Sequence, residues 1–103
     1  MKSISPLELK QYLDSGKEIQ VIDIREDHER VLASIQSIHI PMEYVLSSIE
    51  RIRTDVPVVI HCQSGQRAAA VIYALEKKYS LSNLHNLEGG IVAWREEFPL
   101  QTA

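Results

Sequence analysis

Short apolar segments alternate with helical segments along this chain, and that alternation constrains its fold more than any other feature. Residues 19–24, 56–62 and 84–87 have strand character, and the first segment is too apolar for a strand with one face in water. A brief strand is also expected over residues 37–40, just before Pro41. Strands that alternate with helices favour a parallel sheet with right-handed crossovers and helices on both faces. The sequence therefore predicts an α/β fold.

Helix signals fill the intervals between these segments. Ser5, Pro6 and Glu8 form a capping box with a proline at the first helical position, and Gly16 can end that helix in the left-handed conformation. The other expected helices lie at residues 26–32, 42–53 and 68–79 and, after a tight turn at Gly89-Gly90, around Trp94. No repeat or linker divides the chain, so we expect one domain over residues 1–103 with its core at about 5–98.

Composition argues against several classes of function. The 103 residues carry a formal net charge of −3 and the eleven lysines and arginines are scattered, so no surface for nucleic acid or an anionic membrane is expected. No window approaches the ~18 apolar residues of a membrane span and no apolar signal segment is visible, so a cytoplasmic location is expected. The single cysteine cannot form an internal disulfide. The four histidines are not spaced as metal ligands, and we expect no metal site.

The loop that follows the strand over residues 56–62 has the features of a reactive site. It runs from Cys62 to Arg67, with Gln63, Ser64, Gly65 and Gln66 between them. In open α/β sheets, ligands bind beyond the carboxyl ends of the strands, which is where Cys62 stands. Main-chain N–H groups in such a turn, and the start of the next helix, favour an anion at the sulfur. Gly65 allows a bend that a β-carbon would resist, and Arg67 can offer a planar fork of donors to an oxyanion or to the loop's own carbonyls.

Neighbouring residues are weighed against simpler structural roles. A lone cysteine at the end of an apolar strand is usually a small core residue, but the glycine-containing loop and the arginine favour a reactive thiol here. His61 precedes Cys62, and because adjacent strand residues point to opposite faces, a packed or solvent-touching histidine is favoured over a base for the thiol. Asp23 and Arg25 share a strand face, so they are expected to form a structural ion pair or to hold a neighbouring loop.

Three segments of the chain carry a family resemblance when they are taken together. They are Val21-Ile22-Asp23-Ile24-Arg25, the loop Cys62-x-x-Gly65-x-Arg67, and Asn86-Leu87-Glu88-Gly89-Gly90-Ile91-Val92-Ala93-Trp94. In this order they resemble the early Asp-Val-Arg strand, the active loop and the closing Leu-Gly-Gly-Trp segment of the rhodanese family of sulfurtransferases. The likeness covers the chain from about Ser5 to Trp94. It implies a single rhodanese-like domain with a central five-stranded, mostly parallel sheet.

The resemblance also implies a chemistry and a set of partners. Cys62 would be the nucleophile that carries sulfane sulfur as a persulfide, taken from thiosulfate or a protein persulfide donor. The acceptor would be a thiol, cyanide or a sulfur-carrier protein. The main-chain amides from Gln63 to Arg67 would bind the outer sulfur, with Arg67 orienting it and its donor. No cofactor is implied beyond the covalent persulfide.

Two departures from the family pattern indicate a subgroup. Ala33-Ser34-Ile35-Gln36-Ser37 stands where many members have Gly-His-Ile-Pro-Gly. That pattern resembles the rhodanese domains fused behind the adenylating enzymes of molybdopterin and thiamin sulfur-carrier pathways. Gln63 and Gln66 are neutral where many users of thiosulfate carry a basic residue, which leaves Arg67 as the loop's one cation.

Two alternatives stay open beside the autonomous sulfurtransferase. In the first, the domain is a non-autonomous sulfur-relay module of an adenylating enzyme. In the second, it is a cysteine phosphatase or an arsenate reductase, because a phosphate needs a similar cysteine-to-arginine loop. Cysteine phosphatases place five residues between the cysteine and the arginine, whereas residues 63–66 make four. The shorter loop is expected to suit a sulfur atom better than a tetrahedral phosphoryl group.

Overall fold

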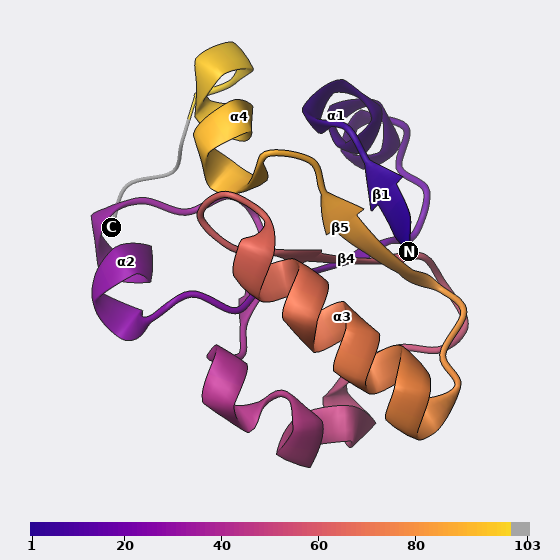
Figure 1. Ribbon diagram of the computed structural model, residues 1–103. Coiled ribbons are helices and arrows are strands. Elements are labelled where there is room, and N and C mark those ends of the chain that lie inside the picture. Colours follow the sequence, from indigo (N-terminus) through magenta and orange to yellow (C-terminus); the bar gives the residue numbers. More distant parts are fainter. Residues whose placement is uncertain (100–103) are drawn as a thin grey trace.

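Five strands form one sheet in the computed structural model, which describes residues 1–99 (Figure 1). The strands are β1 (Lys2–Ile4), β2 (Gln20–Asp23), β3 (Ile38–His39), β4 (Val58–His61) and β5 (Leu84–Leu87). Their order across the sheet is β1-β5-β4-β2-β3, and every neighbouring pair is parallel. The predicted α/β fold with a five-stranded sheet is confirmed.

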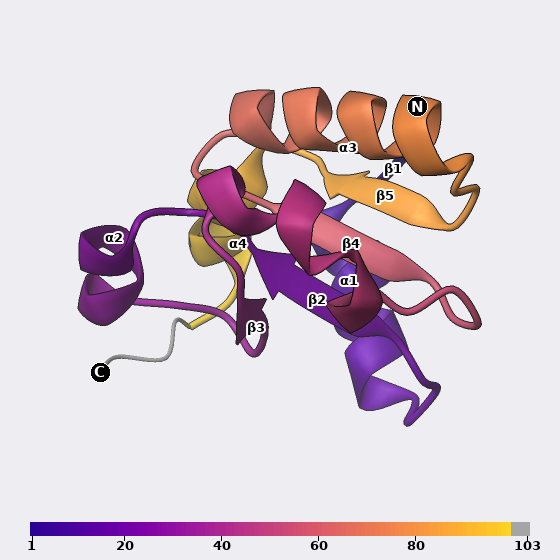
Figure 2. The same ribbon diagram turned by 90° about the horizontal axis from the view of Figure 1, so that it is seen from below.

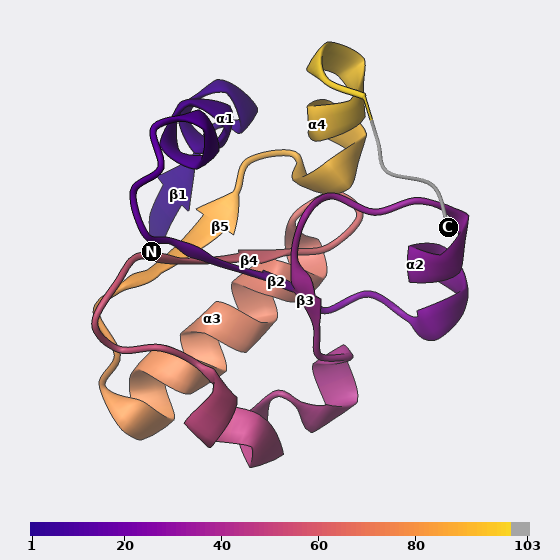
Figure 3. The same cartoon turned by 180° about the vertical axis from the view of Figure 1, so that it is seen from behind.

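Helices cover both faces of the sheet, as predicted. They are α1 (Pro6–Asp14), α2 (Asp27–Leu32), α3 (Gln66–Tyr79) and α4 (Gly90–Glu97), with two 3₁₀ segments, η1 (Met42–Tyr44) and η2 (Leu46–Arg51), after β3. Figure 1 shows α1 and α4 on one face, and Figure 2 shows η1 and η2 on the same side as α3. Figure 3 shows α2 standing apart from both layers, beyond the end of β2. None of these described helices has the length and apolar character that a bilayer crossing requires.

The sheet separates two apolar clusters, one on each face. Ile22 and Ile60 belong to the cluster under α3, whereas Val21 and Val59 belong to the cluster under α1 and α4. Successive residues of β2 and β4 therefore point to opposite faces and both are buried. This burial explains why the two central strands lack the apolar–polar alternation of a strand with one face in water.

Two elements differ from what the sequence predicts. The sequence pattern does not indicate β1, in which only Ile4 is buried and which is held by parallel pairing with β5. The single helix expected over residues 42–53 is two 3₁₀ segments with a kink at Ser48. The hydroxyl of Ser47 donates to the carbonyl oxygen of Tyr44 at 3.0 Å, a local bond that competes with helix formation.

The start of α1 confirms the predicted capping box. The amide of Glu8 donates to Ser5 Oγ at 3.1 Å, and the amide of Ser5 donates to Glu8 Oε1 at 2.9 Å. The helix ends at Asp14, and Gly16 follows it with a positive φ of 77°.

The strand order creates a switch point at the centre of the sheet. The chain leaves β2 toward β3 on one side and leaves β4 toward β5 on the other. The carboxyl ends of β2 and β4 therefore flank the kind of crevice in which open α/β sheets bind ligands.

Candidate active site

Cys62 lies at this switch point, directly after β4. The residue is 1% exposed and belongs to the apolar cluster under α3. The Gly65 amide donates to its Sγ at 3.1 Å, and the Ala68 amide donates to the same atom at 3.4 Å. Two main-chain dipoles therefore converge on the sulfur and favour negative charge there.

The carbonyl groups of the loop are bound by donors outside this cradle. The Cys62 oxygen accepts from the Ile91 amide at 3.0 Å, and a second amide of α4 binds the Gln63 oxygen. The Gly65 oxygen accepts from Asn86 Nδ2 at 3.1 Å. The first N–H groups of a helix have no partner in that helix, so α4 supplies donors that would otherwise be unpaired. These bonds fix the loop backbone in the conformation in which the Gly65 amide donates to the sulfur.

Two glycines permit this arrangement. Gly65 precedes α3 with a φ of +105°, in the left-handed region that other residues rarely adopt. A Cβ at Gly90, where φ is +61°, would lie 2.6 Å from the Gln63 carbonyl carbon and 2.7 Å from the Cys62 oxygen. Gly90 is thus more than part of a turn, because it lets α4 approach the backbone of the cysteine loop.

The remaining predicted loop residues lie around the cradle. The side chains of Ser64 and Gln66 are exposed, and Gln63 is half-buried. Ala68 lies one residue beyond the predicted set of site residues. It is the third residue of α3, so its amide has no hydrogen-bond partner within the helix and is available to the sulfur. The place of Ala68 in the first turn of the expected helix could therefore have identified its amide as a donor to the sulfur.

An acidic partner from α2 engages the guanidinium of Arg67. Arg67 Nη1 and Nη2 donate to the two carboxylate oxygens of Glu29 at 2.8 and 2.9 Å. These hydrogen bonds lower the pKa of Glu29 to about 2, so the pair is ionised at neutral pH. The sequence predicts an oxyanion or the loop carbonyls as the partner of Arg67, and the structure provides a carboxylate instead. No local signal identifies Glu29, which lies 38 residues away in sequence.

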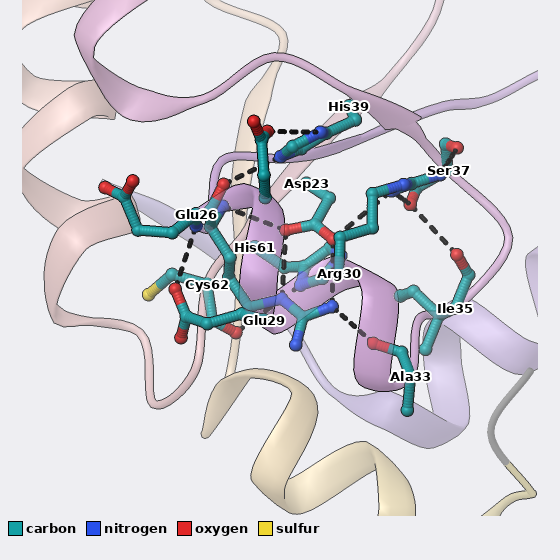
Figure 4. A network of polar contacts seen from close by, with 12 residues as sticks. Asp23, Glu26, Glu29, Arg30, Ala33, Ile35, Ser37, His39, His61 and Cys62 are labelled. Atoms are coloured by element: carbon teal, nitrogen blue, oxygen red, sulfur yellow. Dashed lines mark hydrogen bonds and ion pairs between the residues drawn. The ribbon is translucent and has the colours of Figure 1, made fainter. Parts of the chain in front are cut away.

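A buried polar network anchors the segment that carries Glu29 (Figure 4). Arg25 Nε and Nη2 donate to the two carboxylate oxygens of Asp23, each at 3.0 Å, which confirms the predicted ion pair. Arg25 Nη2 also donates to the Ala33 oxygen at 2.8 Å, and Arg30 Nη1 donates to Asp23 Oδ2 at 3.2 Å. Burial alone would raise the pKa of Asp23, but the bonds and charges around it hold that pKa below its ordinary value.

His61 belongs to this network and not to the thiol. Its Nε2 lies 3.9 Å from Asp23 Oδ2, and its Nδ1 lies 3.4 Å from the Cys62 carbonyl oxygen. The residue is fully buried, and this burial lowers the pKa of His61 to about 4. The interpretation as a packed histidine is confirmed. Within the described part of the chain, no three His, Cys, Asp or Glu side chains are grouped as metal ligands.

A cleft of about 150 Å³ opens beside the cysteine loop. Its walls come from the segment after β2, from the loop and from α4, and they comprise Arg25, Glu29, Leu32, Ala33, Gln63, Ile91 and Arg95. Two arginines and one glutamate thus face the same space. Sequence reasoning misses Arg95 because this residue reaches the loop only through the packing of α4.

The fold and the site define an α/β domain with a cysteine-centred anion cradle at the carboxyl edge of a parallel sheet. The family model of the rhodanese-like domain matches residues 5–97, and the chain belongs to this family. A crystal structure of a rhodanese-like domain protein from Staphylococcus aureus is 33% identical, with a TM-score of 0.87 and coverage of 100% of this chain and 99% of that chain. The resemblance inferred from the three sequence segments is therefore confirmed.

Two curated relatives support a sulfurtransferase class for the chain. Thiosulfate sulfurtransferase GlpE of Pseudomonas paraeruginosa is 30% identical over 102 residues, which cover 97% of this chain and 89% of that protein. "Probable adenylyltransferase/sulfurtransferase MoeZ" of Mycobacterium tuberculosis is 33% identical over 98 residues, which cover 92% of this chain. The match covers 25% of MoeZ, so the chain spans about a quarter of that relative's length. The likeness to MoeZ agrees with the predicted resemblance to rhodanese domains of adenylating enzymes.

Proposed function

We propose that this protein transfers sulfane sulfur as a persulfide carried on Cys62. The observation that carries the proposal is the pair of amides, from Gly65 and Ala68, that donate to Sγ at 3.1 and 3.4 Å. A thiolate and a persulfide anion both gain from such dipoles, so the same cradle serves the free and the loaded enzyme. Membership of the rhodanese-like family and the sulfurtransferase relatives agree with this chemistry.

The reaction has two displacement steps. In loading, the Cys62 thiolate attacks the sulfane sulfur of thiosulfate, a new S–S bond forms, and sulfite leaves with the electron pair of the broken S–S bond. In discharge, an acceptor thiolate or cyanide attacks the outer sulfur, and the electron pair returns to Cys62 Sγ. Each step conserves charge, and no cofactor beyond the covalent sulfur takes part. The outer sulfur is surrounded by the loop residues Gln63, Ser64, Gly65 and Gln66. Arg67 forms an ion pair with Glu29 that supports this loop, and in this way Arg67 orients the outer sulfur.

A protein persulfide is the second candidate donor, with a sulfur-carrier protein as acceptor. The neutral Gln63 and Gln66 and the engagement of Arg67 by Glu29 leave no free cation for thiosulfate within residues 62–67. The likeness to MoeZ, which is named for both adenylyl and sulfur transfer, favours a relay of this kind. In this form the domain would act in the cytoplasm as one module of a sulfur-carrier pathway.

Mass spectrometry of the intact protein tests the proposal. After treatment with thiosulfate or with a loaded cysteine desulfurase, the protein should gain the mass of one sulfur atom, and a thiol should remove it. Cys62→Ser is the control, and it should gain nothing. Failure of the unmodified chain to gain sulfur from either donor rejects the proposed function, and hydrolysis of an aryl phosphate would favour the phosphatase alternative instead.

A further inference from the structure

We propose that the cleft beside the cysteine loop is an anion subsite in which Arg95 binds the charged group of the small molecule that exchanges sulfur with Cys62. The assignment of a sulfur compound rests on the proposed function, whereas the location and charge of the subsite rest on the structure alone. The cleft borders Gln63, the residue after Cys62, and Ile91, whose amide binds the Cys62 carbonyl. A ligand in it therefore lies next to the reactive loop.

The charges that face the cleft leave Arg95 available for a ligand. Arg67 engages both carboxylate oxygens of Glu29, and Asp23 engages Nε and Nη2 of Arg25. Among residues 1–99, the side chain of Arg95 forms no ion pair or hydrogen bond, and Nη1 of Arg25 also has no partner. Two sets of N–H donors on different walls of one cleft are the kind of site that binds a carboxylate or a sulfonate.

The size and the apolar walls of the cleft limit the ligand. Its volume of about 150 Å³ is below the roughly 300 Å³ at which pockets for drug-sized ligands begin. Leu32, which is 76% exposed, and Ile91 provide a hydrocarbon surface beside the arginines. These features fit a small compound in which a carboxylate or a sulfonate lies close to the sulfur that is exchanged. The compound is either the donor, as in thiosulfate, or a carboxylated thiol that accepts sulfur.

When the ligand is the carboxylated thiol that accepts sulfur, the transfer needs no further reagent. The thiolate of the carboxylated thiol attacks the outer sulfur of the Cys62 persulfide, and a new S–S bond forms to the acceptor. The bond to Sγ breaks, and its electron pair stays on Sγ as the thiolate. Arg95 binds the carboxylate throughout and takes no part in the bond changes.

Alkylation of Cys62 tests the subsite without any sulfur transfer. Iodoacetate and iodoacetamide react with the same thiolate, but only iodoacetate is negatively charged. We expect the rate constant for iodoacetate, divided by that for iodoacetamide, to fall roughly two- to fivefold in Arg95→Ala, which is the effect of losing one exposed ion pair. In Arg95→Glu this ratio should fall further. Arg95→Lys should keep most of the ratio because it keeps the charge.

Arg51→Ala is the matched control for the loss of an exposed arginine. Arg51 belongs to η2, and its carbonyl oxygen accepts from Gln20 Nε2 at the start of β2. Arg51 therefore lies near the amino ends of the strands, whereas Cys62 lies at their carboxyl ends. An unchanged ratio in Arg95→Ala, or an equal fall in Arg51→Ala, overturns the subsite. A fall confined to the Arg95 variants, in a protein that takes sulfur from no donor, upholds the subsite and rejects the proposed function.

Sulfur-exchange rates identify which substrate carries the anion. The discharge arm compares 3-mercaptopropionate with the neutral 2-mercaptoethanol, and the loading arm uses thiosulfate. If Arg95→Ala slows discharge by 3-mercaptopropionate alone, the ligand is the carboxylate of the acceptor. If it slows loading alone, the ligand is the sulfonate of the donor. Unchanged rates in both arms, in a protein that does exchange sulfur, overturn the proposal.

Discussion

At the scale of single residues, the packing of the cysteine loop depends most directly on Gly90. A side chain there would meet the carbonyls of Cys62 and Gln63, in a backbone conformation that is already strained for other residues. We expect Gly90→Ala to lower the free energy of unfolding by about 2 kcal/mol or more. Because the loop must move, the rate of alkylation of Cys62 by iodoacetamide should change several-fold. Urea unfolding and alkylation kinetics measure the two effects.

Gly16→Ala is the matched control for this substitution. Gly16 has a positive φ of 77°, but nothing lies within 4 Å of the place that a Cβ would take at that site. Its replacement should cost about 1 kcal/mol for the backbone alone and leave the reactivity of Cys62 unchanged. Equal effects of the two substitutions on Cys62 would show that Gly90 supplies only a turn.

The residues of the site differ in how far the sequence reveals them. Cys62, Gly65 and Arg67 are visible because a strand end, a permissive residue and a helix start follow one another in the chain. Glu29 and Arg95 are not visible, because only the packing of α2 and α4 brings them to the loop. The geometry of the cysteine loop was thus predictable where it is local in sequence, and the charged residues that surround the loop were not.

At the scale of elements, the ion pair between Glu29 and Arg67 links α2 to the start of α3. Its geometry is bidentate and its side chains are 20% and 33% exposed, so it should be worth more than a fully exposed pair. We expect a double-mutant cycle of Glu29→Ala and Arg67→Ala to give a coupling of about 1 kcal/mol in urea unfolding. The exposed pair Lys10–Asp14 is the control, with an expected coupling of about 0.3 kcal/mol. If the coupling energy of Glu29 and Arg67 is no larger than that of the control pair, their ion pair does not link α2 to α3.

Elements were predictable where their own residues determine them. The capping box of α1 and the buried strand β4 are examples, because propensity, capping and burial all agree there. The segment over residues 42–53 has helical spacing of apolar residues, but only Val45 and Ile52 of that spacing are buried, whereas Met42 and Leu46 are exposed. The apolar face is therefore buried only in part, which does not hold a continuous helix. The three residues of β1 become a strand through pairing with β5, which no pattern within three residues can indicate.

At the scale of the whole molecule, the burial of His61 at the end of the central strand β4 makes the free energy of unfolding depend on pH. Its pKa of about 4 in the folded protein lies below the ordinary value of 6.5, because burial disfavours the charged ring. Between these values the unfolded chain binds a proton that the folded chain does not, so the free energy of unfolding rises with pH. Acidification from about 6.5 to 4 should therefore lower stability by up to about 3 kcal/mol.

A second titration separates this effect from that of Glu29. The pKa of Glu29 is lowered from 4.5 to about 2, so its contribution to stability is present above about 4.5 and is lost as the pH falls from there toward 2. Urea unfolding from pH 7 to 3 should then show one decline in the free energy of unfolding above pH 4.5 that disappears in His61→Gln. A second decline below pH 4.5 should become smaller in Glu29→Gln, while the lowered pKa of Asp23 still contributes to it. NMR titration of the His61 ring checks the first assignment in the unaltered protein, since an ordinary pKa for this ring would leave the decline above pH 4.5 without its cause.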